Sequence, residues 1–69
     1  MTLHEAIEKV LRDNHHAMSS SDIAEAINTA HLYEREDKNP VPSSQISARV
    51  NNYPLLFKRE ERKITLRNW

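Results

Sequence analysis

The stretch over residues 42–53, PSSQISARVNNY, decides the fold that we expect for this chain. Ile46, Val50 and Tyr53 recur at positions i, i+4 and i+7, which is the spacing of one apolar face of a helix. A proline is favoured at the first position of a helix, and Pro54 disfavours helical geometry at the residue before it. The pattern therefore predicts a short helix over about residues 42–53 with a proline at each end.

The opposite face of this predicted helix is small or amide-bearing and carries no acidic side chain. Short side chains let a backbone approach a partner closely, and Asn, Gln and Arg can present paired hydrogen-bonding groups to base edges. We interpret the stretch as a candidate recognition helix; the alternative is an ordinary core helix whose polar face is poor in charge. The candidate nucleic-acid-binding residues of the stretch are Ser44, Gln45, Ser47, Ala48, Arg49, Asn51 and Asn52.

Length and composition limit the class of protein. A chain of 69 residues is expected to form one small domain, residues 1–69, which buries about 60% of its unfolded surface. The absence of cysteine excludes a disulfide scaffold and a thiolate metal site, and it suits a reducing compartment. No secretory signal or membrane-spanning run is visible, so we expect no membrane partner and a cytoplasmic location, or a nuclear one in a eukaryote. The absence of glycine excludes a Gly-rich phosphate loop.

The net charge of zero conceals a polarity along the chain. Residues 1–37 carry eight acidic and three basic side chains, whereas residues 38–69 carry seven basic and two acidic ones. Such an asymmetry suggests one face suited to an anionic partner. It is weak evidence alone, since nucleic-acid-binding domains are commonly basic overall.

The residues before the 42–53 stretch predict two further helices. Thr2 and Glu5 form a capping-box pattern ahead of apolar residues at helical spacing, which predicts a helix over about residues 3–13. Ser19 repeats the capping logic and predicts a helix over about residues 20–30. A short extended piece could lie between them. The polar connector 31–41 is longer than the tight turn of about three or four residues in the simplest helix-turn-helix.

After Pro54 the apolar pattern alternates, which predicts two short strands in a hairpin over about residues 56–67. Its apolar residues would cover the end of the core. The expected charged tip shows four basic residues, Lys58, Arg59, Arg62 and Lys63. These side chains could simply protect an edge strand from pairing with other chains, or they could contact phosphates beside the recognition helix.

Helix, helix, longer link, helix and hairpin is the order of a winged helix, an α+β fold. Over nearly its whole length the chain also resembles the HARE-HTH winged helices. The residues that carry this resemblance are Leu3–Leu11, Met18–Ile27, Asn39–Val50, and Phe57–Arg59 with Ile64–Leu66.

The resemblance implies a DNA-associated module, like those of chromatin proteins, restriction and repair enzymes, and the delta subunit of bacterial RNA polymerase. The end of the chain, Ile64–Trp69, looks most like the end of the N-terminal domain of that delta subunit. The chain departs from many relatives because its wing turn contains no glycine. This departure leaves the length and conformation of the wing open.

Catalytic and metal chemistry find little support in the sequence. Of the four histidines, His15 and His16 are adjacent and diverge, and His4 pairs only with Glu8 at i+4. They do not supply the three or four ligands that zinc requires. Helix capping accounts for the serines, and so short a chain has little volume for a cleft that shifts pKa values. We therefore expect no catalytic residue, no metal and no cofactor, and no enzyme.

Two functional hypotheses follow. In the first, the 42–53 helix enters the major groove of double-stranded DNA while the hairpin contacts phosphates, and binding by a monomer is weak and salt-sensitive. In the second, the domain docks on a transcription or chromatin protein, such as RNA polymerase, or on a fused effector domain. The second hypothesis uses the 3–13 helix, the 31–41 connector, or the exposed end at Leu55 and Trp69.

Overall fold

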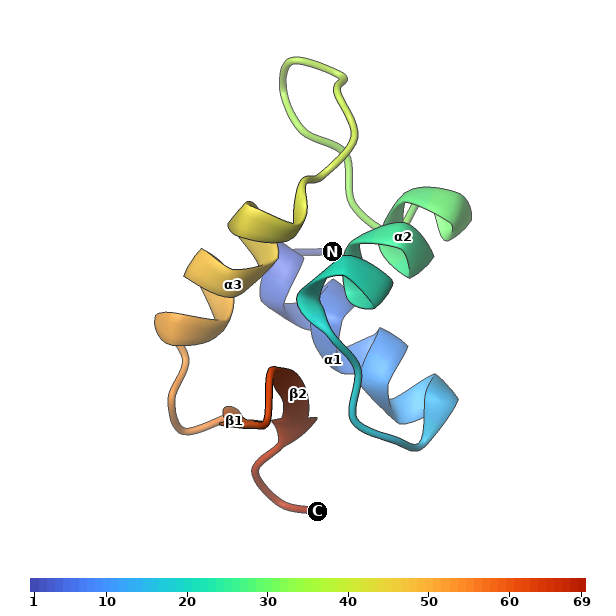
Figure 1. Ribbon diagram of the computed structural model, residues 1–69. Coiled ribbons are helices and arrows are strands. Elements are labelled where there is room, and N and C mark those ends of the chain that lie inside the picture. The colour runs from blue at the N-terminus through green and yellow to red at the C-terminus, as the bar shows by residue number, and fades with distance from the viewer.

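Three helices and a C-terminal hairpin make up the computed structural model, which describes residues 1–69 (Figure 1). The elements are α1 (Leu3–Asn14), α2 (Ser20–Ala30), α3 (Ser43–Asn51), β1 (Phe57–Glu60) and β2 (Lys63–Leu66). The long connector between α2 and α3 lies at the end of the molecule opposite the hairpin (Figure 1). This layout confirms the predicted α+β winged helix-turn-helix.

Side-chain caps start α1 and α2, as the sequence predicts. The Thr2 hydroxyl accepts the Glu5 N–H at 3.3 Å, and the Glu5 carboxylate accepts the Thr2 N–H at 2.8 Å. These hydrogen bonds from Thr2 hold the pKa of Glu5 below its ordinary value, since they favour the charged carboxylate. Ser19 accepts the Asp22 N–H at 3.1 Å. The predicted bounds of α2 are confirmed, and α1 ends one residue later than expected.

Helix α3 is shorter than the predicted 42–53. Pro42 has extended backbone geometry and lies just before the first helical residue rather than at it. At the other end, Asn52 and Tyr53 donate to the carbonyls three residues back at 3.1 Å, so the helix closes in a 3₁₀ turn. Tyr53 leaves the helix because Pro54 disfavours helical geometry there. Its ring, predicted to continue the apolar face, stacks on His4 with centroids 4.2 Å apart.

The core draws on every element and explains why the hairpin packs on the helices. Ile46 and Val50 bring α3 into it, and Phe57, Ile64 and Leu66 bring in the hairpin. The predicted core is confirmed apart from Tyr53 and Leu56, which are only half-buried. None of the three helices has the length and apolar character needed to cross a membrane.

The hairpin is joined to the helical part through its backbone. β1 and β2 pair antiparallel, with Phe57 opposite Leu66 and Glu60 opposite Lys63. On the other side of β2, the Met18 N–H donates to the Ile64 carbonyl at 3.1 Å, and the Ile64 N–H donates to the Met18 carbonyl at 2.7 Å. The extended piece predicted between α1 and α2 therefore forms a short third partner of the sheet.

The wing turn is short despite its lack of glycine. Two residues, Glu61 and Arg62, connect the strands, and both have positive φ, 48° and 71°. Positive φ at both central residues is the signature of a type I′ hairpin turn, which normally takes Asn-Gly or Gly-Gly. Left-handed geometry costs a residue with a Cβ about 1–2 kcal/mol. The turn is thus tight and strained, which answers the question that the missing glycine raised.

Asn28 fixes the long connector where it enters α3. Its side-chain amide donates to the Val41 carbonyl at 3.0 Å and accepts the Val41 N–H at 2.9 Å. Both groups of one peptide are thereby satisfied by a single side chain of α2. The connector is anchored directly before Pro42, so α2 controls where α3 begins.

We expect Thr65→Val to stabilise the domain by about 1–2 kcal/mol, because it removes a buried polar atom without a partner. The Thr65 hydroxyl is buried and makes no hydrogen bond, and the residue is 7% exposed. Valine has the same shape and suits a strand. Urea denaturation measures the change in the free energy of unfolding. Thr65→Ser, which keeps the hydroxyl and loses the methyl group, should destabilise; a less stable valine variant would contradict the prediction.

Candidate nucleic-acid interface

The outward face of α3 carries small and amide side chains. Ser44, Ala48 and Asn51 lie at i, i+4 and i+7 and are exposed, as is Asn52 just beyond the helix. The remaining predicted contact residues, Gln45, Ser47 and Arg49, are half-buried along its flanks. No acidic residue lies in α3, so a polyanion could approach this face without meeting like charge.

The strand register divides the hairpin into two faces. Phe57 and Arg59 of β1 lie opposite Leu66 and Ile64 of β2, and side chains alternate along a strand. Arg59 therefore shares the face that carries the buried residues Phe57, Ile64 and Leu66. Lys58, Glu60 and Lys63 lie on the other face. This differs from the predicted arrangement, in which all four basic side chains are displayed together at the tip.

Arg59 uses its place on the inner face to contact α3. One terminal N–H donates to the Ser47 carbonyl at 3.1 Å, and Nε–H donates to Asn51 Oδ1 at 3.3 Å. These contacts place the hairpin directly beside the exposed face of α3. The two predicted halves of the interface are therefore adjacent.

Arg67 fixes the link between α3 and β1. Its guanidinium donates to the Pro54 carbonyl at 2.6 Å and to the Phe57 carbonyl at 3.5 Å, and its backbone N–H donates to the Leu56 carbonyl at 2.8 Å. The sequence gave no sign of this role, because an arginine just after an apolar strand is indistinguishable there from a surface charge. Arg67 thus holds the turn that separates helix from wing.

Ion pairs neutralise one half of the molecule and leave cations free in the other. The four bases up to residue 38 all pair with acids: Lys9 with Asp13, Arg12 with Glu8, Arg35 with Asp37 and Lys38 with Glu34. In the second half only Lys58 is paired, with Glu60 at 3.1 Å. The bases without an acidic partner are Arg49, Arg59, Arg62, Lys63 and Arg67. Free positive charge is therefore confined to α3, the hairpin and the residue after it.

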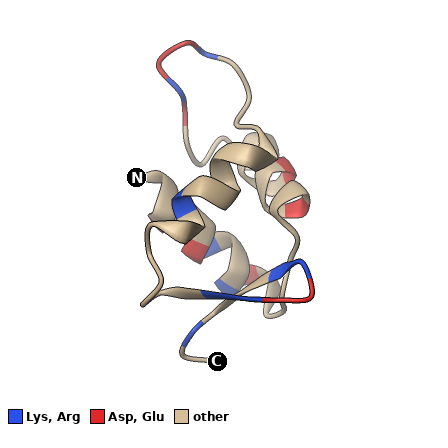
Figure 2. Ribbon diagram, turned by 60° about the vertical axis from the view of Figure 1, so that its left-hand side comes forward, with Lys and Arg blue, Asp and Glu red and all other residues tan.

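Acidic residues interrupt the positive charge at the wing. Glu60 and Glu61 occupy the tip, between the basic segments of β1 and of the turn and β2 (Figure 2). Glu60 is engaged by Lys58, whereas Glu61 is exposed and unpaired. The positive surface near α3 is thus continuous through Arg49 and Arg62–Lys63 only around this acidic tip.

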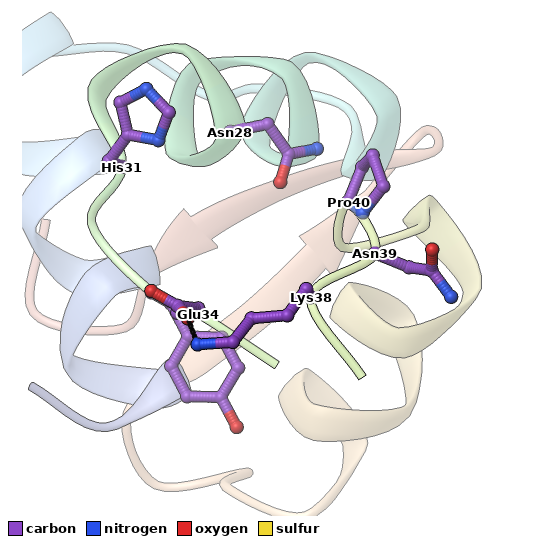
Figure 3. Close-up of a pocket in the computed structure, with 7 residues that line it drawn as sticks. Asn28, His31, Glu34, Lys38, Asn39 and Pro40 are labelled. Carbon is purple, nitrogen blue, oxygen red and sulfur yellow. Dashed lines mark hydrogen bonds and ion pairs between the residues drawn. The ribbon is translucent and has the colours of Figure 1, made fainter. Parts of the chain in front are cut away.

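A hollow of about 280 Å³ lies between the end of α2 and the long connector (Figure 3). Glu34 and Lys38 pair with each other across it, and the Asn28 amide is engaged by Val41. Nearby, Asn39 N–H donates to Asp37 and, with Arg35, lowers the pKa of that carboxyl. No group of three or more His, Cys, Asp or Glu residues is placed to hold a metal ion.

Three helices, a long link before the third, and a hairpin packed against that helix define a winged helix-turn-helix. The model of the HARE-HTH family, described as the ASXL and restriction endonuclease HTH domain, matches residues 1–69. The chain belongs to the HARE-HTH family, which confirms the resemblance seen in the sequence. The family comprises DNA-binding rather than catalytic domains, so this chain is a DNA-binding module of winged-helix class. No curated protein and no solved structure matches the chain.

Proposed function

We propose that residues 1–69 act as one DNA-binding winged-helix domain, in which α3 enters the major groove and the hairpin contacts phosphates. Base edges would be met by Ser44, Gln45, Ser47, Ala48, Asn51 and Asn52, and phosphates by Arg49, Lys58, Arg62 and Lys63. Cells would use such a module in transcription regulation, in the cytoplasm or in a nucleus.

The distribution of unpaired cations carries this proposal. Every base of α1, α2 and the connector is neutralised by an acid, whereas Arg49, Arg62 and Lys63 are free and flank a helix face without acids. Phosphate contacts position a protein on the duplex, and base contacts select sequence. With about three or four phosphate contacts, the logarithm of the binding constant should fall with the logarithm of salt with a slope of about −3 to −4.

A titration of short duplex DNA into isotope-labelled protein tests the proposal. At low salt we expect the amide signals of α3 and the hairpin to shift, and those of α2 and the connector to stay in place. Raising the salt should weaken binding with the slope given above. If the α3 and hairpin signals do not move, or if the affinity ignores salt, the proposal is wrong.

The second candidate function, docking on a transcription or chromatin protein such as RNA polymerase or on a fused effector domain, is favoured by two exposed apolar side chains. Leu55 is 87% exposed and Trp69 is 51% exposed. Neither is needed for the DNA contacts proposed above. Replacing both by serine should leave DNA affinity unchanged and abolish partner binding, whereas a loss of DNA affinity would exclude a separate docking role.

A further inference from the structure

The hydrogen bond between Arg59 and Asn51 fixes which way the Asn51 amide faces. A guanidinium carries five N–H donors and no acceptor, so the amide atom that meets Nε–H must be the oxygen. The second bond, to the Ser47 carbonyl, holds the guanidinium against α3 and limits its rotation. The Asn51 oxygen is therefore turned toward the hairpin, and its NH₂ group has no partner within the protein.

We propose that Arg59 is a positioning residue that makes Asn51 a hydrogen-bond donor toward DNA. The inference rests on the proposed function and specifies what α3 selects. A bidentate contact between asparagine and adenine needs the amide oxygen to accept from N6 and the NH₂ to donate to N7. With the oxygen held by Arg59, only the donor is presented. Guanine offers two neighbouring acceptors, N7 and O6, in the major groove, so Asn51 selects guanine over adenine.

The competing role for Arg59 is a direct phosphate contact, which the sequence alone suggests. The register argues against it, because Arg59 lies on the face of β1 that also carries buried Phe57. Arg62 and Lys63, in contrast, are exposed and make no ion pair or side-chain hydrogen bond. The two roles differ in charge dependence: a phosphate contact needs the charge, whereas positioning needs two donors at fixed angles.

Arg59→Lys separates these roles, since lysine keeps the charge but lacks the planar fork that reaches two acceptors. Duplexes selected from a randomised pool by the wild-type domain should show guanine preferred over adenine at one position by about tenfold. In Arg59→Lys this preference should fall to within about twofold, with the salt slope unchanged. Asn51→Ala should lose the same preference, and the double variant should lose no more.

Arg62→Met is the matched control for a phosphate contact. It should reduce the magnitude of the salt slope by about 0.9 and leave base preference intact. Arg59→Met should instead leave the slope unchanged and relax the preference. An amide spectrum of each free variant verifies that it is folded. Should an Arg59 variant fail to fold, Asn51→Ala in the wild-type background still tests the guanine preference.

The outcomes divide cleanly. An unchanged base preference in folded Arg59→Lys, or a slope change in Arg59→Met that matches Arg62→Met, overturns the positioning role. A preference for adenine at the position that depends on Asn51 overturns it as well. If the wild-type domain does not bind duplex DNA at low salt, the proposed function fails and this inference fails with it. Wild-type binding with any of the first three results overturns the inference alone.

Discussion

Asn28→Asp should destabilise the domain by about 2–3 kcal/mol at neutral pH, although it changes one atom. The carboxylate can still accept the Val41 N–H, but it cannot donate to the Val41 carbonyl that Asn28 satisfies at 3.0 Å. A buried acceptor without a partner costs about 1–3 kcal/mol, and a negative charge facing a carbonyl oxygen adds to this. A domain of this size has a free energy of unfolding of only about 3–10 kcal/mol.

Acidification should reverse much of this loss. A protonated carboxyl regains a donor, so the folded state favours the protonated form and raises the pKa of the new group. The lost stability should therefore return as the pH falls from about 7 to about 4, relative to the wild-type domain at each pH. Urea denaturation at several pH values measures it. Thr29→Ala, at an exposed neighbouring position, is the control; an Asn28→Asp variant as stable as this control would contradict the anchor.

Arg62→Glu combined with Lys63→Glu should weaken duplex binding about a hundredfold at low salt, because two phosphate contacts become repulsions. Both residues are exposed and unpaired, so the fold should persist. Fluorescence anisotropy with a labelled duplex measures the dissociation constant. Arg59 is left untouched here, since its contacts with Ser47 and Asn51 would confuse a loss of charge with a loss of position.

The matched control makes the same change in net charge at the far end of the molecule. Arg35→Glu combined with Lys38→Glu alters the connector, whose bases are already paired with acids. It should weaken binding only several-fold, through long-range repulsion. Equal losses in the two double variants would mean that net charge, and not the hairpin, governs binding.

Much of this fold is encoded in local patterns that a sequence displays directly. Thr2 and Ser19 mark helix starts because capping involves residues only three apart, and the spacing of Ile46 and Val50 gives the inner face of α3. The order of elements then identifies the winged helix. These features depend on neighbours along the chain, so they can be recognised without knowledge of tertiary packing.

The features that the sequence did not reveal depend on contacts between distant residues. Asn28 meets Val41 across thirteen positions, and no local pattern links an amide in α2 to that peptide. The direction of Arg59 depends on strand register, since a shift of one residue would turn its side chain to the opposite face. The turn at Glu61 and Arg62 was equally hidden, because neither residue type favours positive φ. The predicted contact residues of α3 and the hairpin remain a prediction at the level of individual contacts.

The two hydrogen bonds between Met18 and Ile64 have a mechanical consequence for the hairpin. They join β2 to the segment between α1 and α2, while Ile64 itself is buried in the core. The wing therefore cannot swing or peel away as a flexible arm, since any such movement would open the helical part too. A partner that pulls on the tip works against the whole domain, and the Ile64 N–H should exchange with solvent only when the entire chain unfolds.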